Sequence, residues 1–349
     1  MKTILSVIGA RPQFIKAAPV SRALRARDAI REITVHTGQH FDRDMSDVFF
    51  AELNLPLPDL HLGIHGGGHG AMTGRMMVAL EETILSVKPD AVLVYGDTNS
   101  TLAGAVAAAK LFLPVAHVEA GLRSYDRRMP EELNRVVADH LSDLLLCPTT
   151  AAMENLAKEG ITRGVHNVGD VMFDAAQHAA RVAGSRSQIL DRLGLVPKTY
   201  AVATVHRPAN TDDPNALAAV MEWLDARAAE HPVVLPLHPR TRQAMARAGL
   251  APRAVRLIEP IGYIDMASLL RQSVAVYTDS GGVQKEAYFY RVPCVTLRPN
   301  TEWVETIEAG WNRLWRDPEY KQPRREIAEY GDGNAAGKIV DILMAKFNA

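Results

Sequence analysis

The chain has 349 residues, enough for two domains, and its 39 Lys and Arg nearly balance its 40 Asp and Glu, giving a formal charge of −1. This balance argues against a large electrostatic surface for nucleic acid or anionic membrane, and the 47% hydrophobic content is that of an ordinary globular protein. Two distant cysteines, Cys147 and Cys294, exclude a disulfide framework and a zinc site, and no apolar run is long enough to span a bilayer. We therefore expect a cytoplasmic protein that binds neither nucleic acid nor membrane.

Short apolar runs, typical of strands buried on both faces, alternate with longer helical patterns. Expected strands are 4–8, 33–36, 91–95, 115–118 and 144–147 in the first half, and 201–205, 233–237, 255–258, 274–278 and 294–297 in the second. Expected helices include 70–87, 99–110, 130–140, 215–230 and 282–290. This alternation predicts an α/β protein with two Rossmann-like parallel sheets.

The alternation is interrupted at 170–198, where no strand is predicted and where we place the connection between domains. The expected domains are 1–169 and 170–333, facing each other across a cleft. A last helix near 334–347 is expected to pack back on the first domain.

Polar residues follow nearly every predicted strand. Because the carboxyl ends of parallel strands meet at one edge of a sheet, these residues predict a binding cleft. A turn or helix-capping role explains any one of them, but hardly all of them together. They include Arg11, Gln39, His40, Asp97, Glu119, Arg123, His206, Arg207, His238 and Ser280.

The segment 279–282, Asp-Ser-Gly-Gly, ends a predicted strand and opens a predicted helix. Gly281 and Gly282 let the backbone approach a ligand, and the helix N-terminus favours a phosphate. Glu286, one turn along, is placed to accept hydrogen bonds from ribose hydroxyls, although a surface glutamate explains this position equally well. The glycine patterns of dinucleotide-binding proteins and of P-loop nucleotidases are absent.

Three carboxylates, Asp97, Glu119 and Glu131, come from the first half of the chain, together with cations suited to balance them or to hold a diphosphate. These cations are Arg11, Lys16, Arg123 and Arg135. The neighbouring Glu132 is interpreted as a helix-dipole residue.

Outside this group, we interpret His117 as a hydrogen-bonded core residue and the tryptophans 303, 311 and 315 as packing residues. His65 and His69 flank a triple glycine, which makes a zinc pair improbable.

Five segments together resemble the non-hydrolysing UDP-N-acetylglucosamine 2-epimerases. They are 9–16 (GARPQFIK), 96–101 (GDTNST), 117–123 (HVEAGLR), 130–135 (PEELNR) and 279–286 (DSGGVQKE). The resemblance implies the two-domain fold shared with one class of nucleotide-sugar glycosyltransferases, commonly a homodimer, and no metal or redox cofactor. It also implies a reaction in which UDP is eliminated across C1–C2 and then added back with C2 inverted.

By this resemblance, Asp97, Glu119 and Glu131 carry the acid–base work, and His206 and Arg11 steady the diphosphate. Ser280, Gly281 and Gly282 hold the phosphates, Glu286 holds the ribose, and Lys16 and Arg135 stabilise charge on the departing UDP. Further contacts to the nucleotide sugar are expected from Gln39, His40, Arg123, Arg207, His238 and Arg298.

Departures from the family pattern bear on the substrate. Gln13 replaces the usual Glu of the first loop, residues 301–305 read TEWVE rather than TERPE, and the Arg-Gln pair of an allosteric site is missing from 66–70. These features resemble the subgroup that acts on UDP-2,3-diacetamido-2,3-dideoxy-glucuronate, a precursor of bacterial surface polysaccharide such as lipopolysaccharide. His65, His69 and Arg298 are candidates to contact its additional groups. UDP-N-acetylglucosamine remains the other candidate substrate.

Three alternatives stay open. A glycosyltransferase of the same architecture would share the phosphate loop and Glu286 but would not need the three carboxylates. A hydrolysing 2-epimerase would release UDP, and a regulator that only binds the UDP sugar would show no turnover.

Overall fold

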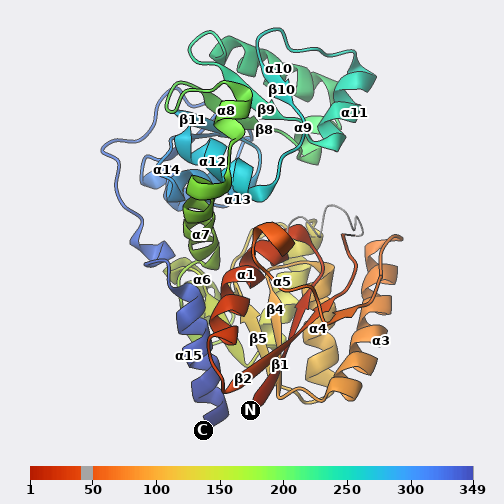
Figure 1. Cartoon of the computed structure of the whole chain (residues 1–349). Coiled ribbons are helices and arrows are strands. Elements are labelled where there is room, and N and C mark those ends of the chain that lie inside the picture. Colours follow the sequence, from red (N-terminus) through yellow and green to blue (C-terminus); the bar gives the residue numbers. More distant parts are fainter. Residues whose placement is uncertain (41–49, 349) are drawn as a thin grey trace. The chain divides into compact units, whose positions relative to one another are not determined.

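The computed structural model describes residues 1–40 and 50–348, and the chain divides into two compact units (Figure 1). Unit 1 combines Met1–Ala175 with Ala328–Ala349, and unit 2 comprises Ala176–Ile327. Each unit contains one parallel sheet with helices against it, so the predicted fold class, two Rossmann-like domains, is confirmed.

The sheet of unit 1 has seven strands in the order β3-β2-β1-β4-β5-β6-β7, and every pairing is parallel. The central strands consist mostly of buried apolar residues because helices cover both faces of the sheet. The strands are β1 (Lys2–Ile8), β2 (Ile30–His36), β3 (Leu60–His61), β4 (Ala91–Tyr95), β5 (Val115–Val118), β6 (Leu144–Cys147) and β7 (Val165–Asn167).

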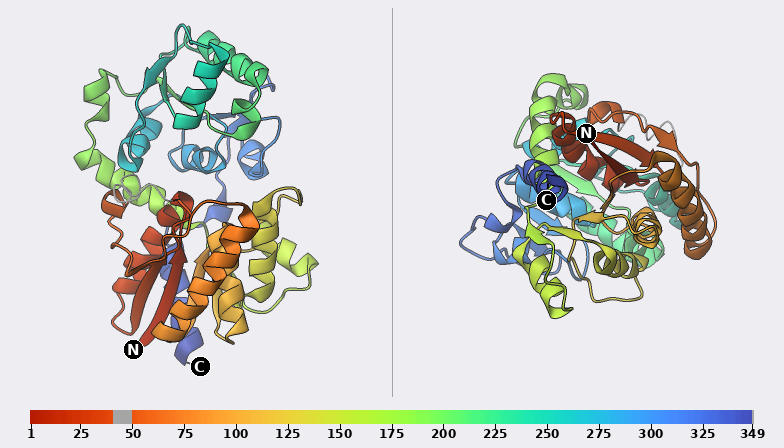
Figure 2. Two further views of the ribbon diagram at one scale, coloured as in Figure 1. Left: turned by 90° about the vertical axis from the view of Figure 1, so that its right-hand side faces the viewer. Right: turned by 90° about the horizontal axis from the view of Figure 1, so that it is seen from below.

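Right-handed crossovers decide which face each helix of unit 1 covers. The chain moves one way along the sheet from β1 to β2 and the other way from β3 to β6, so the connecting helices lie on opposite faces. Helices α1 (Arg11–Arg25) and α15 (Ala335–Asn348) share one face, whereas α3 (His69–Val87), α4 (Asn99–Lys110) and α5 (Pro130–Leu141) cover the other (Figure 2). The unit also contains α6 (Thr150–Lys158), the first residues of α7 (Val171–Arg186) and the 3₁₀ turn η1 (Ala328–Tyr330).

The C-terminal helix is held in unit 1 by specific contacts. Asp174 accepts hydrogen bonds from the backbone N–H groups of Ala335 and Ala336, at 3.1 and 2.8 Å, at the N-terminus of α15. Arg27 forms an ion pair with Asp341 of α15 at 2.8 Å. These contacts explain why a segment more than 150 residues downstream completes the first unit.

Unit 2 has six parallel strands in the order β10-β9-β8-β11-β12-β13. Two apolar clusters on opposite faces of the sheet form its core. Its strands are β8 (Ala201–Thr204), β9 (Val233–Pro236), β10 (Arg256–Ile258), β11 (Ala275–Thr278), β12 (Cys294–Thr296) and β13 (Asn312–Leu314). Its helices are most of α7, then α8 (Ile189–Leu193), α9 (Pro208–Thr211), α10 (Pro214–Arg227), α11 (Pro239–Ala248), α12 (Tyr263–Gln272), α13 (Gly281–Phe289) and α14 (Val304–Glu308).

The predicted elements agree with these bounds to within a few residues, and three strands were not predicted. The strands β3, β7 and β13 have only two or three residues each and are only partly apolar, so they lack the continuous hydrophobic run that marks the central strands. The segment 170–198, expected as a connection, contains the helices α7 and α8.

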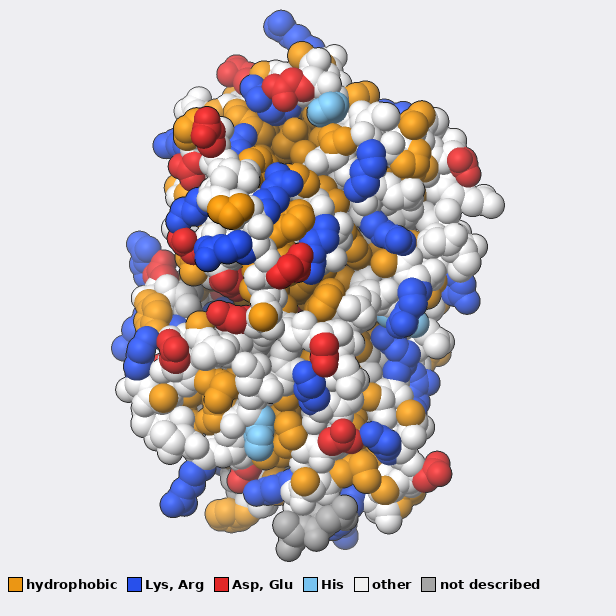
Figure 3. Space-filling model, turned by 90° about the vertical axis from the view of Figure 1, so that its left-hand side faces the viewer, with side chains coloured by type: hydrophobic (Ala, Val, Ile, Leu, Met, Phe, Trp, Pro, Cys, Tyr) orange, Lys and Arg blue, Asp and Glu red, His pale blue; other side chains and the backbone are white. Residues whose placement is uncertain are grey.

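Charged groups of both signs are interspersed on the face of the molecule shown in Figure 3. No helix within residues 1–40 and 50–348 is long and apolar enough to cross a bilayer.

Tryptophans contribute to packing as expected: Trp315 packs on the core of unit 2, and the Trp311 indole donates a hydrogen bond to the Arg325 carbonyl at 2.9 Å.

Candidate active site

Each sheet has one point at which its strand order reverses. In unit 1 this point lies between β1 and β4, and in unit 2 between β8 and β11. In open parallel sheets, ligands bind beyond the carboxyl ends of the strands at such a point. Most of the predicted site residues follow these strands and their neighbours, so each unit presents one group of them at its own reversal point.

In unit 1, the loop after β1 is shaped by a buried glutamine. The Gln13 side-chain oxygen accepts hydrogen bonds from the N–H groups of Gly9 and Ala10, at 2.8 and 3.1 Å, and its amide nitrogen donates to the Tyr95 carbonyl at 2.9 Å. An ionised carboxylate at this position could accept but could not donate. The glutamine that departs from the family pattern thus links the β1 loop to the end of β4, a role that the sequence alone did not reveal.

The loop after β2 contacts the same region. The His40 Nδ1 atom accepts a hydrogen bond from the Arg11 backbone at 3.1 Å. The Gln39 side-chain oxygen accepts hydrogen bonds from the Ser100 N–H and hydroxyl groups at 3.1 and 2.9 Å. Gln39 therefore helps to hold the start of α4, and its side-chain carbonyl is engaged within the protein.

Glu119 and Lys16 form a buried ion pair. Their Oε1 and Nζ atoms are 2.8 Å apart, and the side chains are only 8% and 11% exposed. Glu119 has a φ of 70°, in the left-handed region that costs a non-glycine residue about 1–3 kcal/mol. At Gly96, after β4, a Cβ atom would lie 2.9 Å from the Lys16 ammonium. A carboxylate, an ammonium and a glycine backbone therefore converge at the ends of β1, β4 and β5.

Asp97 lies next to Gly96 and is bound by residues of α5. Its carboxylate accepts a hydrogen bond from Arg135, and its backbone carbonyl accepts one from the Asn134 amide at 2.9 Å. Asp97 remains 28% exposed, so it is accessible to a ligand. Glu131, in the first turn of α5, is exposed.

Glu132 has a more specific role than the dipole interaction expected for it. Its carboxylate accepts hydrogen bonds from the N–H groups of Ser124 and Tyr125, both at 2.9 Å, and from the Ser124 hydroxyl at 2.8 Å. Burial raises the pKa of this carboxyl, but the hydrogen bonds and the nearby Arg135 outweigh burial and lower it overall. Glu132 therefore holds the loop before α5.

Arg123 belongs to a buried network that supports this edge of the sheet. Its guanidinium, 1% exposed, is bound by Asp139 at 2.6 Å and by Glu159 at 2.7 Å. The other Asp139 oxygen lies 2.7 Å from His117 Nδ1, and the His117 Nε2 atom lies 2.7 Å from the Gly96 carbonyl. His117 is thus the hydrogen-bonded core residue that the sequence predicted, and Arg123 positions the loop after β5 rather than presenting its charge to solvent.

In unit 2, a fully buried carboxylate organises the loop after β8. Asp279, at the end of β11, accepts hydrogen bonds from the N–H groups of His206 and Arg207, both at 2.9 Å, and from the Asn210 amide at 3.0 Å. The His206 ring lies 3.4 Å from the same carboxylate and 5.4 Å, between ring centroids, from His238. Burial lowers the pKa of His206, and Asp279 partly opposes this effect. Asn210 follows no predicted strand directly, so strand-end reasoning missed it.

The phosphate-binding loop predicted at 280–282 forms the start of α13. Ser280 is the N-cap residue, and its hydroxyl accepts a hydrogen bond from the Val283 N–H at 3.5 Å. A Cβ atom at Gly281 would lie 2.3 Å from Glu302 Oε1 and 3.0 Å from Trp303 Nε1, whereas one at Gly282 would meet nothing closer than 3.9 Å. A side chain at 281 would therefore displace the Glu302 carboxylate and crowd the Trp303 ring even without a ligand.

The segment after β12 lies beside this loop. Glu302 forms an ion pair with Arg298 at 3.0 Å and lies 4.0 Å from Arg207. Trp303 is 8% exposed, and the Lys285 ammonium lies 4.1 Å from the centroid of its ring. Trp303 is thus a packing residue, as predicted, but one that borders the phosphate loop. Glu302, which the sequence analysis did not single out as a site residue, lies against Gly281.

Glu286 is buried, with 5% of its surface exposed, which contradicts the alternative of a surface glutamate. Burial raises the pKa of its carboxyl to about 7, although a hydrogen bond from Tyr263 and the charge of Lys285 act in the opposite direction. A carboxyl whose pKa is shifted in this way beside a predicted phosphate loop is a candidate functional group. It lies one turn beyond the phosphate loop, as the sequence indicated.

Each unit therefore offers a different chemistry. Unit 1 presents carboxylates with paired cations, suited to proton transfer. Unit 2 presents a helix N-terminus with imidazole, guanidinium and carboxyl groups, suited to a phosphorylated ligand.

Of the two histidines flanking the triple glycine, His69 contacts the Asn99 amide at 3.1 Å. The described residues contain no group of three or more His, Cys, Asp or Glu side chains arranged to hold a metal ion.

Sequence comparison finds related proteins over almost the whole chain. Residues 22–344 match the protein family described as UDP-N-acetylglucosamine 2-epimerase. The chain is 50% identical to a UDP-2,3-diacetamido-2,3-dideoxy-D-glucuronate 2-epimerase of Pseudomonas aeruginosa, over 97% of this chain and 99% of that protein. It is 39% identical to a UDP-N-acetylglucosamine 2-epimerase of Methanococcus maripaludis, over 97% and 98% of the two chains.

Solved structures show the same relationship. The UDP-GlcNAc 2-epimerase of Methanocaldococcus jannaschii, in complex with UDP-GlcNAc and UDP, superposes with a TM-score of 0.89 at 38% identity, covering 99% of this chain and all of that one. The enzyme of Neisseria meningitidis bound to UDP-GlcNAc gives a TM-score of 0.88 at 29% identity, covering 98% and 100%.

Proposed function

The chain belongs to the UDP-N-acetylglucosamine 2-epimerase family, and on this premise we propose how its residues invert C2 of a UDP-2-acetamido sugar. It is an isomerase. The observation that carries the assignment of the site is the convergence of the Glu119–Lys16 and Asp97–Arg135 pairs at the reversal point of the first sheet.

The proposed reaction begins with removal of the C2 proton by a carboxylate of unit 1. The C1–O bond to UDP breaks as the C1–C2 double bond forms, and the electron pair of the broken bond leaves with UDP. In the reverse step, a UDP oxygen attacks C1 while an acid delivers a proton to the opposite face of C2. Two carboxylate groups on different strand ends, Asp97 and Glu119, suit removal and delivery from opposite faces, and Glu131 is a third candidate for this work.

The paired cations balance the charge of these groups. Lys16 and Arg135 each form a direct ion pair with one carboxylate, Lys16 with Glu119 and Arg135 with Asp97. Their charges also stabilise negative charge that develops on the leaving UDP, together with Arg11. Arg123, which is bound by Asp139 and Glu159, positions the Glu119 loop in this proposal and does not contact the nucleotide.

Unit 2 is proposed to bind UDP. The N–H groups at the start of α13, with Ser280, Gly281 and Gly282, bind the phosphates, and Glu286 accepts hydrogen bonds from the ribose hydroxyls. His206, held by Asp279, steadies the diphosphate, with Arg207 and His238 beside it. Because proton transfer and phosphate binding belong to different units, turnover requires both groups of residues to contact the same sugar nucleotide.

For the substrate, we favour the 2,3-diacetamido-2,3-dideoxy-glucuronate form of the UDP sugar over UDP-N-acetylglucosamine. The 50% identity to an enzyme named for the former supports this choice, against 47% to a protein named as a UDP-N-acetylglucosamine 2-epimerase homolog and 39% to a UDP-N-acetylglucosamine 2-epimerase. Its carboxylate needs a cation, for which Arg298 is the candidate, and the histidines at 65 and 69 are candidates for its added acetamido group.

The cellular context follows from the same premise. The product would serve bacterial surface polysaccharide synthesis, including lipopolysaccharide. The enzyme would act as a homodimer. It would work in the cytoplasm, a reducing compartment in which free cysteines such as Cys147 and Cys294 are the rule.

The proposal is tested by proton NMR in D2O with each UDP sugar in turn. Deuterium entering at C2, with gluco and manno forms interconverting, is the expected result, and the nucleotide that reacts identifies the substrate. Net release of free UDP would indicate a hydrolysing enzyme instead. Tight UDP binding without exchange on either sugar would refute the epimerase assignment and favour a glycosyltransferase.

A further inference from the structure

His117, in β5, has a hydrogen-bond acceptor on each side of its buried ring. The Nδ1 atom lies 2.7 Å from Asp139 Oδ1, and the Nε2 atom lies 2.7 Å from the Gly96 carbonyl oxygen. A carbonyl oxygen can only accept a hydrogen bond, so Nε2 must carry a proton. A neutral imidazole has a single N–H group, so the charge of the ring depends on which partner holds the proton between Nδ1 and Asp139.

Asp139 is bound as an ionised carboxylate. Its Oδ2 atom accepts hydrogen bonds from the Arg123 guanidinium at 2.6 Å and from the Gly121 N–H group at 3.1 Å. Burial raises the pKa of this carboxyl, but the charges and hydrogen bonds of His117 and Arg123 outweigh burial and lower it overall. The proton between the two side chains therefore belongs to Nδ1, and both ring nitrogens of His117 are donors.

The charges around Asp139 are balanced when His117 is cationic. Asp139 and Glu159 both bind the buried Arg123 guanidinium, so two carboxylates share one arginine. The Cys147 thiol on β6 adds no charge, because burial and the nearby Asp139 raise its pKa to about 12. An unbalanced charge is costly where water is excluded, and a protonated His117 supplies the missing positive charge.

Other histidines of unit 1 show the opposite pattern. The Nδ1 atom of His36 accepts a hydrogen bond from the Gly38 N–H group at 3.0 Å. His40 Nδ1 accepts one from the Arg11 N–H group at 3.1 Å. A ring nitrogen that accepts carries no proton, so both rings are neutral, and burial lowers the pKa of His36 to about 4. His117 differs from them because both of its neighbours are acceptors.

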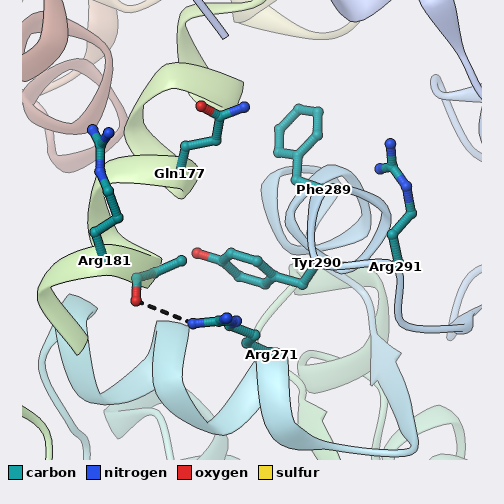
Figure 4. A pocket seen from close by; sticks show the side chains of 7 residues that line it. Gln177, Arg181, Arg271, Phe289, Tyr290 and Arg291 are labelled. Carbon is teal, nitrogen blue, oxygen red and sulfur yellow. Dashed lines mark hydrogen bonds between the residues drawn. The ribbon is translucent and has the colours of Figure 1, made fainter. Parts of the chain in front are cut away.

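Burial makes the charge of His117 informative. Arg181 and Arg271, beside a pocket of unit 2 (Figure 4), are exposed, and Arg271 donates a hydrogen bond to the Ala180 carbonyl at 3.3 Å. Water solvates such guanidinium groups, so their charges need no partner inside the protein. His117 is 0% exposed, so its charge must be held by the groups that surround it.

We propose that His117 is a stable imidazolium that positions Asp97 for the epimerase reaction, by holding the Gly96 carbonyl with one N–H group and Asp139 of α5 with the other. This role rests on the proposed function, in which Asp97 transfers a proton. A hydrogen bond from a charged donor is roughly twice as strong as one between neutral groups, so the imidazolium holds this carbonyl more firmly than a neutral ring would.

Gly96 connects this contact to the reactive groups. It has a φ of 61°, lies in the turn that follows β4, and directly precedes Asp97. His117 lies two residues before Glu119, which follows β5. One buried ring thus links the two strand ends that carry both carboxylates, and Asp139 anchors that ring to α5.

The charge is tested by NMR of the ligand-free full chain labelled with 15N in histidine alone, which reports the protonation of each ring nitrogen. Of the twelve histidines, we expect one to keep protons on both ring nitrogens at about pH 8.5, where an ordinary histidine is neutral. This pattern should disappear in His117→Gln and persist in His231→Gln, the same change at an exposed position. If every histidine of the natural protein has a bare ring nitrogen at that pH, the proposal is overturned, whether or not His117→Gln folds.

The positioning role is tested by deuterium exchange at C2. Glutamine can donate to the Gly96 carbonyl but carries no charge, so His117→Gln should lower kcat roughly tenfold or more while KM and the Kd of UDP stay nearly unchanged. His231→Gln should change none of these values. A normal kcat in His117→Gln, or a loss confined to KM, would overturn the positioning role.

These measurements separate the charge of His117 from the proposed function. If the natural protein shows no turnover, the proposed function fails and the positioning role fails with it, but the NMR experiment still decides the charge of the ring. A doubly protonated ring that persists in His117→Gln would overturn the assignment of that charge to His117.

Discussion

Glu286→Gln should stabilise the protein at alkaline pH while weakening its binding of UDP. The Glu286 carboxyl is buried, and burial raises its pKa from 4.5 to about 7. In the unfolded chain the carboxyl ionises near its ordinary value, so the unfolded state gains more from ionisation than the folded state does. At 1.36 kcal/mol per pKa unit, this difference costs the folded state about 3 kcal/mol once the pH exceeds 7.

The free-energy cost of burying the Glu286 carboxyl depends on pH. Below about pH 4 the carboxyl is protonated in both states and costs nothing, whereas the cost grows as the pH rises and levels off above about 7. Glutamine at 286 is neutral throughout and can still accept the hydrogen bond from Tyr263. The free energy of unfolding of Glu286→Gln should therefore exceed that of the natural protein by about 3 kcal/mol at pH 8 and by only about 1 kcal/mol at pH 5.

Urea denaturation of the ligand-free protein at both pH values measures this difference, with Glu319→Gln, at an exposed position, as the control. Calorimetry with UDP measures the effect on binding. A glutamine accepts ribose hydrogen bonds less strongly than a carboxylate and should weaken UDP binding by about tenfold. A stability difference that is absent, or equal at pH 5 and pH 8, would refute the account of Glu286 as a carboxyl kept buried at a cost in stability.

Four further substitutions and one scattering measurement probe other parts of the protein. Asp97→Asn should lower the rate of deuterium exchange at C2 by about 10²–10⁴-fold while UDP still binds, and near-normal exchange would remove Asp97 from the acid–base group. Gly281→Ala should lower the stability and weaken UDP binding, because its Cβ would displace the Glu302 carboxylate, 2.3 Å away, and crowd the Trp303 ring at 3.0 Å. Gly282→Ala, with 3.9 Å of clearance, should leave the stability unchanged; calorimetry and urea denaturation compare the two variants. Asp139→Asn should cost about 1.5–3 kcal/mol of unfolding free energy, because it removes one of the two carboxylates that bind the buried Arg123 guanidinium and leaves only Glu159, and a loss under 1 kcal/mol would contradict the structural role given to this network. Small-angle X-ray scattering should show compaction at saturating UDP if substrate brings the two groups of residues together, and unchanged dimensions would count against that requirement.

The sequence by itself determined the fold class and the central strands. Continuous apolar runs such as 91–95 and 144–147 mark strands buried on both faces, and the observed strands Ala91–Tyr95 and Leu144–Cys147 have these same bounds. The short edge strand β3 has exposed side chains, so its pairing with β2 depends on backbone hydrogen bonds that no hydrophobic pattern reports. Local pattern therefore predicted the middle of each sheet better than its edges.

The sequence also identified which residue types gather at the strand ends, but only the tertiary structure decided what each one does. Arg123 and Glu131 looked alike as site candidates, yet Arg123 is enclosed by Asp139 and Glu159 while Glu131 is exposed. Glu286 read equally well as a surface residue, and only its burial gives it a pKa of about 7. Burial and pairing depend on which distant segments pack against a side chain, and that information is distributed over the whole chain rather than written in any local motif.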